Sequence, residues 1–462
     1  MLDIMIIFAK YFTPILVLIY TYISFMVFGV KPKQLSELTK SKISPLERKK
    51  RERMNEIVSE RKKNRMFAMQ YLIVYIFHCL YFYILFLRDG SYATILLGIF
   101  ELLFLVISTQ IYNIVYEKIS RLLFNNMIML MDIGFVIIAR LNYDMAIKQF
   151  IIIVVGTTLC LLIPLIIDKF NTIDKYDKIY AAVGLGMLVC VLFLASEKFG
   201  AKNWITINNT SIQPSEFVKI IFVFCMASML TKAKNLKELI GISLLAAAHV
   251  IILVVEKDLG AALLFFITYF VMLYISQKNG LYMILGSVMG ILAAFLAYNV
   301  PQFGHVRTRV IAWLDPWSNI DGAGYQVAQS LFAIGTGSWF GLGLTKGMPS
   351  KIPVRESDFI FSVICEEMGV IIGIMIILIC LSNYIMFINI AMQIKDAFYK
   401  LIAIGLSTMY IFQVLLTIGG VTKFIPSTGV TLPFVSYGGS SIISTLIIFN
   451  VVQGLYVRKA SS

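Results

Sequence analysis

Long apolar runs separated by short polar breaks dominate the chain. Cutting the sequence at charged, Pro-bearing or Gly-bearing breaks leaves thirteen apolar stretches, each of which predicts a helix. A helix of about 20 residues rises about 30 Å, which matches the hydrocarbon thickness of a bilayer. All but one stretch are long enough to span it, and the short 217–231 needs flanking residues. The stretches are 5–29, 66–87, 93–116, 121–140, 148–167, 179–196, 217–231, 239–255, 259–276, 281–299, 359–391, 398–420 and 441–457.

The composition supports a membrane location. Hydrophobic residues make up 59% of the 462 residues and charged residues only 14%, whereas a soluble domain has about 25% charged residues. The excess apolar surface has to face lipid, so an ordinary cytosolic enzyme is excluded and an all-α polytopic membrane protein is predicted. The six cysteines and three histidines show no paired or metal-ligand spacing, so the residues predict neither a disulfide framework nor a metal site.

The net charge of +14 is concentrated in one segment. Residues 31–65 contain thirteen Lys or Arg against five Glu, a net +8 that leaves +6 for the rest of the chain. Because apolar spans flank this segment, we interpret it as a basic cytoplasmic loop that anchors the protein at the membrane, rather than as an arm that binds nucleic acid.

The short loops predict the orientation, because cytoplasmic loops carry an excess of Lys and Arg. If 31–65 is cytoplasmic, alternation of the spans puts the other short basic loops and the C-terminus inside, and the N-terminus outside. Four segments are then expected on the outer side, namely 197–216, 256–258, 300–357 and 421–440.

Two of these outer segments are unusual. The segment 300–357 is a long connection without an apolar span, and it is too rich in Trp, Phe, Tyr and Gly for disorder, so we expect it to fold against the bundle. The segment 421–440 is apolar but broken by Pro426, Pro433, Gly438 and Gly439. It predicts a re-entrant or surface-lying loop whose backbone is satisfied by protein or water.

Lys and Arg are usually more frequent on the cytoplasmic side of a membrane protein, so cations on the outer side suggest a negatively charged partner there. Guanidinium forks match phosphate oxygens, which predicts an anionic ligand at the outer membrane surface. Ion pairs that stabilise the loop, together with lipid headgroup contacts, are the alternative. The cations of 300–357 are Arg307, Arg309, Lys346, Lys351 and Arg355.

Two groups of ionisable residues could carry chemistry. Asp315 and Asp321 flank a Trp-bearing turn, where a partly desolvated carboxylate could act as a general base; capping of the turn is the alternative. Glu216 and Lys219 lie three residues apart, which places them on one helical face. They form either a structural ion pair or part of a polar cavity.

Five blocks of the sequence resemble the SEDS family, the shape, elongation, division and sporulation proteins typified by FtsW, RodA and SpoVE. The resemblance covers 120–462 and implies a SEDS-like core of ten transmembrane helices with a large extracytoplasmic loop. Residues 1–119 lie outside it as an N-terminal extension with three further transmembrane helices, which could recruit a regulator or anionic lipid or merely extend the bundle. The blocks are 213–219 (QPSEFVK), 256–263 (EKDLGAAL), 309–335 (RVIAWLDPWSNIDGAGYQVAQSLFAIG), 357–369 (SDFIFSVICEEMG) and 428–441 (TGVTLPFVSYGGSS).

The resemblance implies a peptidoglycan glycosyltransferase in a bacterial cytoplasmic membrane. Such an enzyme polymerises lipid II, an undecaprenyl-pyrophosphate-linked disaccharide-pentapeptide, at the outer face, usually beside a class B penicillin-binding protein. The implied reaction is an inverting displacement of pyrophosphate by a sugar hydroxyl. A lipid II flippase or transporter, and a catalytically silent scaffold for a penicillin-binding protein, are the alternatives.

The resemblance also implies site residues, with one departure. The family loop is roughly N-P-W-x-D-P-x-G-x-G-Y-Q, and the carboxylate held to be catalytic aligns with Asn319, whose amide cannot act as that base. Asp321 is therefore the preferred base and Asp315 the second candidate. Cationic side chains, or a divalent cation such as Mg²⁺ or Mn²⁺, would stabilise the leaving charge. The candidate substrate-binding residues are Arg307, Arg309, Lys346, Arg355, Glu216, Lys219, Asp358, Gln326 and Ser436.

Overall fold

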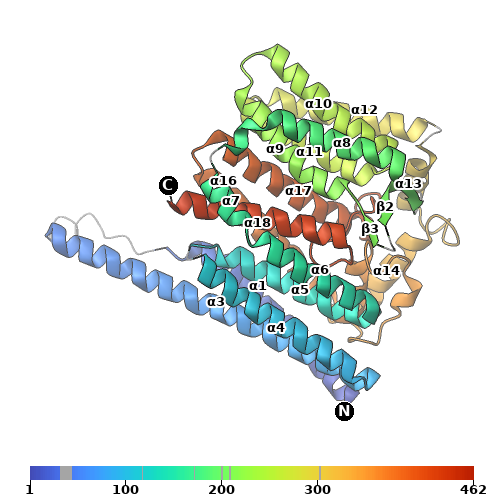
Figure 1. Cartoon of the computed structure of the whole chain (residues 1–462). Coiled ribbons are helices and arrows are strands. Elements are labelled where there is room, and N and C mark those ends of the chain that lie inside the picture. Colours follow the sequence, from blue (N-terminus) through green and yellow to red (C-terminus); the bar gives the residue numbers. More distant parts are fainter. Residues whose placement is uncertain are drawn as a thin grey trace.

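The structure is a computed structural model of a helical bundle with a small antiparallel sheet at one end (Figure 1). It describes residues 1–31, 44–116, 118–170, 172–198, 201–207, 210–300 and 303–461. Within these ranges, twelve helices are long and apolar enough to cross a membrane. The predicted all-α polytopic membrane fold is therefore confirmed.

The elements follow the predicted apolar stretches closely. The long helices are α1 (Leu2–Gly29), α3 (Pro45–Asp89), α4 (Tyr92–Val115), α5 (Arg121–Leu141), α6 (Tyr143–Cys160), α8 (Asp177–Leu194), α9 (Ser215–Lys232), α10 (Leu236–Val255), α11 (Leu259–Gln277), α12 (Leu281–Asn299), α16 (Val370–Gln393), α17 (Ala397–Val421) and α18 (Gly439–Ser461). The short elements are α7 (Ile163–Lys169), α13 (Gly304–Leu314), α14 (Tyr325–Gly337), α15 (Ile360–Met368), the 3₁₀ turns η1 (Ile173–Lys175) and η3 (Pro349–Lys351), and the strands β1 (Ser196–Lys198), β2 (Ala201–Ile207) and β3 (Thr210–Ile212).

Helix α9 and the 359–391 stretch differ from the simplest expectation. Helix α9 is missing from the twelve apolar helices because Glu216, Lys219 and Lys232 make it more charged than its neighbours. The stretch 359–391 is two helices and not one, because the chain turns sharply at Gly369 between α15 and α16. Gly369 has φ of +95°, and a Cβ there would lie 2.4 Å from the Trp339 carbonyl oxygen, so only glycine fits.

The basic segment 31–65 is not a simple loop. Residues 32–43 lie outside the described part, and from Pro45 onward the segment is the first part of α3. The side chain of Ser44 accepts a hydrogen bond from the Glu47 backbone N–H at 3.3 Å, so a cap and an N-terminal Pro start the helix. Figure 1 shows α3 extending past its neighbours as one continuous rod. The basic charge therefore lies largely on a projecting helix.

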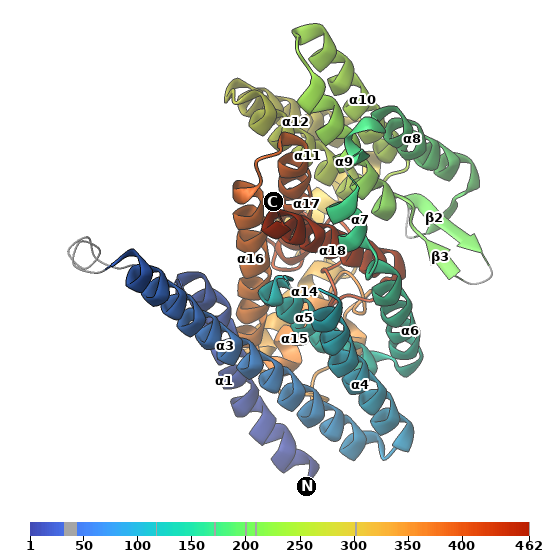
Figure 2. The same ribbon diagram turned by 60° about the vertical axis from the view of Figure 1, so that its left-hand side comes forward.

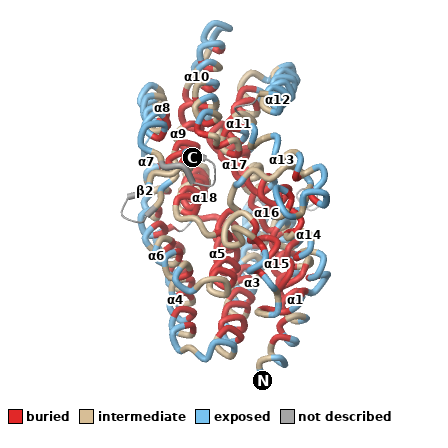
Figure 3. The backbone as a smooth tube through the Cα atoms, turned by 90° about the vertical axis from the view of Figure 1, so that its right-hand side faces the viewer, coloured by how far each residue is buried: buried red, intermediate tan, exposed pale blue. Residues whose placement is uncertain are grey.

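The N-terminal helices pack directly on the rest of the bundle. Helices α1, α3 and α4 lie together (Figure 2), and they contact α5, α6 and α16. Helix α5 is consequently buried along nearly its whole length, whereas α12 is largely exposed (Figure 3). Buried amides cross this interface: Asn125 of α5 donates to Gln70 Oε1 of α3 at 2.9 Å, and Ser24 of α1 donates to Asn126 Oδ1 of α5 at 3.2 Å. Such polar contacts fix how transmembrane helices pair.

A buried hydrogen bond between a histidine and a carboxyl group also joins the N-terminal helices to α5. His78 of α3 lies 2.5 Å from Asp132 of α5, and its other ring nitrogen lies 2.8 Å from the Gly98 carbonyl oxygen of α4.

We expect His78→Leu to lower the free energy of unfolding by about 3–5 kcal/mol, because Asp132 would be left at membrane depth without its partner. Thermal unfolding in detergent measures this loss. The neighbouring Cys79→Ala is the control, since Cys79 is exposed, and an equal change in both variants would contradict the prediction.

The segment 422–438, within the predicted loop 421–440, packs inside the bundle, and we call it the re-entrant segment. Phe434 and Val435 are buried, and a Cβ on Gly134 of α5 would lie 2.7 Å from the Phe434 carbonyl oxygen. Side chains of neighbouring helices satisfy the exposed carbonyls: Gln413 donates to Thr431 O at 3.0 Å, and Gln149 donates to Ser436 O at 3.4 Å. The polar backbone is thus tolerated inside the bundle.

The two ends of the bundle differ. The N-terminus, the strands, α13 and α14 lie at one end, whereas the C-terminus and α7 lie at the other (Figure 1). Contacts join the segments that were expected outside: Arg309 bonds to the Ser427 carbonyl, and the Lys202 N–H donates to the Glu256 carbonyl. These segments therefore form one continuous face, which we call the outer end.

Candidate active site

A cavity of about 170 Å³ lies at the outer end. Helices α13 and α14, the end of α17, the start of α15 and the re-entrant segment surround it. Its polar lining residues are Thr308, Arg309, Gln326, Asp358, Thr417, Ser427 and Thr428. Three of the predicted site residues, Arg309, Gln326 and Asp358, therefore meet here although up to 49 positions separate them (358 − 309).

Arg309 and Asp358 lie beside the same backbone position. Gly429 has φ of +74°, and a Cβ there would lie 3.6 Å from Asp358 Oδ2 and 3.8 Å from Arg309 Nη2. Arg309 also donates from Nη1 to the Ser427 carbonyl at 3.1 Å. Burial raises the pKa of Asp358, and a hydrogen bond from Ser357 and the charge of Arg309 counteract part of that rise. The cavity thus holds one partly desolvated guanidinium next to one buried acid.

The other polar lining groups are neutral. The Thr428 hydroxyl is buried and has no hydrogen-bond partner among the described residues, and Gln326 presents an exposed amide. A cation surrounded by neutral donors is suited to an anion such as a phosphate group. The Thr428 hydroxyl is therefore available to form a hydrogen bond with a ligand in the cavity.

The two loop acids have different environments. Asp315 accepts hydrogen bonds from the backbone N–H of Trp317 at 3.2 Å and of Ser318 at 3.3 Å, and from the Ser318 hydroxyl. These bonds, with the Ser318 hydroxyl first, lower the pKa of Asp315. Asp315 therefore braces the turn, as the alternative reading held.

Asp321 is exposed, and no hydrogen bond or ion pair engages it within the described ranges. It lies two residues before Ala323, which lines the cavity. The turn between them is tight, because Gly322 and Gly324 both donate to the Asn319 carbonyl at 3.0 Å. A Cβ on Gly324 would lie 2.3 Å from the Pro316 carbonyl oxygen. The Asp321 carboxylate, which no described residue binds, is therefore close in sequence to a residue that lines the cavity.

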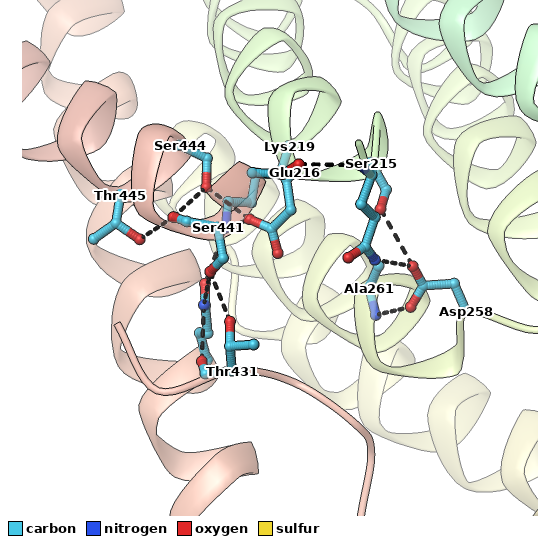
Figure 4. Close-up of polar contacts among 12 residues, drawn as sticks. Ser215, Glu216, Lys219, Asp258, Ala261, Thr431, Ser441, Ser444 and Thr445 are labelled. Carbon is cyan, nitrogen blue, oxygen red and sulfur yellow. Dashed lines mark hydrogen bonds and ion pairs between the residues drawn. The ribbon is translucent and has the colours of Figure 1, made fainter. Parts of the chain in front are cut away.

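Glu216 and Lys219 form a buried polar network inside the bundle (Figure 4). The Lys219 ammonium lies 2.5 Å from Glu216 Oε2 and 3.0 Å from Gln413 Oε1. Ser444 donates to Glu216 at 2.6 Å. The pair is therefore a satisfied ion pair that joins α9 to α17 and α18, and Gln413 links it to the re-entrant segment.

The Asp258 carboxylate fixes the junction of α9 and α11 beside the re-entrant segment. Asp258 accepts from Gln213 at 2.8 Å, from Ser215 at 3.2 Å and from the Ala261 N–H at 3.1 Å, so it caps α11 and fixes the start of α9 (Figure 4). A Cβ on Gly260 would lie 2.5 Å from the Val430 side chain. Close packing at Gly260 thus holds the cavity lining in place.

The remaining predicted substrate-binding residues do not line the cavity. Arg307 lies over the Tyr298 ring at 6.0 Å, and Arg355 pairs with Glu356 at 3.2 Å. Lys346 pairs with Asp3 at 2.8 Å. Ser436 donates to the Ser357 carbonyl at 2.6 Å and accepts from the Leu432 N–H at 2.9 Å, so its hydroxyl fixes the backbone beside Asp358. The predicted cluster of outer cations is therefore dispersed.

Sequence reasoning missed the polar residues before Val430. Ser427, Thr428 and Gly429 line the cavity, and two of them lie in the 428–441 block from which only Ser436 was selected. The Thr-Gly pair was the available signal, because a glycine in an irregular apolar segment marks a close backbone approach.

The described residues contain no group of three or more His, Cys, Asp or Glu side chains that could hold a metal ion.

Glu256 makes stability depend on pH. Its side chain is buried, and neither carboxylate oxygen has a hydrogen-bond partner among the described residues. Burial, followed by the nearby Asp258, raises the pKa of Glu256 from its ordinary 4.5 to about 8. Between these two values the folded protein binds one more proton than the unfolded chain, so the free energy of unfolding falls as the pH rises, and the contribution of Glu256 is constant above about 8.

Thermal unfolding in detergent from pH 5 to pH 9 measures this dependence. We expect Glu256→Gln to flatten the decline between pH 5 and pH 8, because the amide carries no titrating proton. An unchanged slope in the variant would show that another group is responsible.

Comparisons with known proteins give one consistent result. The sequence model of a family described as "Cell cycle protein", FtsW/RodA/SpoVE, matches residues 113–460. The peptidoglycan glycosyltransferase RodA of Mycobacterium tuberculosis is 34% identical over 353 residues, which cover 70% of this chain and 75% of RodA. Stage V sporulation protein E of Bacillus subtilis is 32% identical over 287 residues, covering 60% of this chain and 78% of that protein.

Solved structures share the fold. A chain in the structure of a peptidoglycan synthase complex that coordinates polymerization and crosslinking has a TM-score of 0.63 at 22% identity, and the match covers 74% of this chain and 99% of that one. The rod shape determining protein RodA of Thermus thermophilus has a TM-score of 0.54 at 22% identity, covering 73% and 96% respectively.

Proposed function

Because this chain belongs to the FtsW/RodA/SpoVE family of cell cycle proteins, we propose that it is a peptidoglycan glycosyltransferase that polymerises lipid II at the outer face of a bacterial cytoplasmic membrane. Relatives that cover most of the chain are named peptidoglycan glycosyltransferases. The twelve apolar helices agree with a multi-pass protein of that membrane. The proposed partner is a class B penicillin-binding protein that crosslinks the product.

One observation supports the activity most directly, namely the Arg309 and Asp358 pair in a cavity next to the Asp321 turn. A lipid-linked pyrophosphate needs a cation where it departs, and the cavity places Arg309 among neutral donors such as Thr428. The Ser427 carbonyl accepts a hydrogen bond from that guanidinium, and the nearby charge of Asp358 favours its protonated form, counteracting the lowering of the Arg309 pKa by burial. Removal of a pyrophosphate from a sugar is the reaction that this arrangement favours.

The proposed mechanism is a single inverting displacement. Asp321 takes the proton of the acceptor sugar 4-hydroxyl, and the resulting oxygen forms a bond to the anomeric carbon of the donor. The bond between that carbon and the pyrophosphate oxygen breaks, and the pyrophosphate leaves with the bonding electron pair. Arg309 stabilises the charge that develops on it. No covalent enzyme intermediate is needed.

The decisive experiment gives purified protein, alone and with its class B penicillin-binding protein, labelled lipid II. Polymer of increasing length on a gel supports the proposal. Failure to form polymer under both conditions would contradict it and favour the transport or scaffold alternatives, which a lipid II translocation assay in vesicles then separates.

A further inference from the structure

Helix α1 lies outside the residues that match the family, yet it contacts a segment within them. The match begins at residue 113, whereas α1 ends at Gly29. Its outer half contacts residues 338–348, which connect α14 to the 3₁₀ turn before α15 and which we call the outer segment. This contact is thus a feature of this chain in addition to the family fold.

Three contacts join α1 to the outer segment. Asp3 pairs with Lys346 at 2.8 Å, and the rings of Tyr11 and Phe340 lie 5.3 Å apart. Between them, Ile6 is only 3% exposed. The ion pair is exposed, so solvent screens it and it contributes little to the attachment. The apolar contacts of Ile6 and Tyr11 therefore provide most of the attachment.

Gly343 allows Ile6 to pack this closely. A Cβ on Gly343 would lie 2.4 Å from Ile6 Cγ2, and its φ of +104° strains any other residue. Two residues further on, Thr345 has φ of +76°. The outer segment is thus held in an unusual backbone conformation at the point where α1 meets it.

The outer segment connects the two helices that wall the cavity. It follows α14 directly, and its Leu342 and Gly343 N–H groups donate to the carbonyls of Glu366 and Glu367 in α15 at 2.8 and 2.9 Å. The Glu366 carboxylate accepts from Met348 N at 3.0 Å. A displacement of the outer segment would therefore move α14 and α15 relative to each other.

The Glu367 carboxylate completes the connection. It accepts from Thr345 N at 3.1 Å and pairs with Arg140 of α5 at 3.0 Å, and its side chain is fully buried. Residues of both walls line the cavity, Gln326 from α14 and Asp358 directly before α15. The contacts form a continuous path from α1 to the two polar side chains.

We propose that α1 is an intramolecular clamp, which holds the outer segment against the bundle and thereby positions the α14 and α15 walls of the cavity for catalysis. Ile6 and Tyr11 are positioning residues, because they act through Gly343 and Phe340 and touch no reacting atom. The kinetic consequence rests on the proposed function, whereas the clamp itself rests on the contacts.

The first test is hydrogen exchange on the full-length protein. Ile6→Ala removes most of the buried side chain against Gly343, so backbone amides of 338–348 are expected to exchange faster by about tenfold, because local opening becomes easier. Ile7→Ala is the matched control: Ile7 is the next residue of the same helix and is 57% exposed. Equal exchange in wild type and Ile6→Ala would overturn the clamp.

The second test is steady-state polymerisation of lipid II by the same proteins. A small misplacement of the cavity walls is expected to lower kcat about tenfold in Ile6→Ala while KM changes less than about twofold, because alignment suffers more than binding. Ile7→Ala is expected to match wild type. Faster exchange without a fall in kcat would overturn the positioning role.

A charge exchange provides a second pair of variants that does not alter the apolar contact. Asp3→Lys is expected to accelerate exchange in 338–348 by about twofold, since it places two cations together, and adding Lys346→Asp is expected to restore it. Failure of the double variant to restore exchange would contradict the Asp3 contact. If wild type forms no polymer, the proposed function fails, while the exchange measurements still decide the clamp.

Discussion

Asp321→Asn is expected to reduce lipid II polymerisation by about 10²–10⁴-fold, because the amide cannot take the proton of the acceptor hydroxyl. Binding of lipid II should persist, since Asp321 is exposed at its turn and none of the described residues bonds to it. The measurement is the initial rate of polymer formation on a gel, with a thermal melt to verify folding. A variant that keeps its rate would exclude Asp321 as the base.

Two companion variants distinguish Asp321 from its neighbours. Asp315→Asn is expected to keep its rate within a few-fold and to lower the melting temperature slightly, because it weakens the hydrogen bonds that brace the turn. Asn319→Asp, introduced into Asp321→Asn, is expected to restore part of the rate, since the family loop places its carboxylate there. Loss of polymer in Asp315→Asn with intact folding would assign the base to Asp315 instead.

Arg309→Met is expected to lower polymerisation by about 10²–10³-fold, because the cation that stabilises the leaving pyrophosphate is lost. It should also destabilise the protein, since the nearby positive charge that favours the Asp358 carboxylate is lost. Arg309→Lys keeps the charge but not the planar fork, so an intermediate rate is expected. Arg307→Met should have the smaller effect, because Arg307 lies over Tyr298 and outside the cavity.

A double variant separates the two consequences of losing Arg309. Adding Asp358→Asn to Arg309→Met removes the unpaired acid, so stability should recover while the rate stays low. Thermal unfolding and polymerisation are measured on the same preparations. Recovery of the rate together with stability would show that Arg309 is structural only.

The sequence selected three residues that the fold brings to one cavity. Arg309, Gln326 and Asp358 were selected from two separate blocks, and the cavity brings all three together. Lys346 was selected, like Arg309, as a cation on the outer side, but it pairs with Asp3. The charge of a residue and its side of the membrane can be inferred from the nearby sequence. The ion-pair partner of a long cationic side chain depends instead on which distant segment packs beside it.

The structural context of the loop acids shows the same limit. Asp315 and Asp321 were equivalent by spacing, with capping as the alternative to catalysis for both. In the turn, the Asp315 carboxylate accepts hydrogen bonds from Trp317 and Ser318, whereas no described residue bonds to Asp321. A hydrogen-bonded turn forms from neighbouring residues, but its exact bonds follow from the glycines that let it close, such as Gly324.

The sequence by itself determined the membrane location, the thirteen helices, the face shared by Glu216 and Lys219 and the family. These features depend on hydrophobic length and helical periodicity, which act over one or two turns. Only the tertiary structure decided that 422–438 packs inside the bundle, that the basic segment continues as α3, and that α1 contacts the outer segment. Those outcomes depend on close packing of distant segments against particular glycines. The apolar pattern of a chain does not show which distant segment will pack at each glycine.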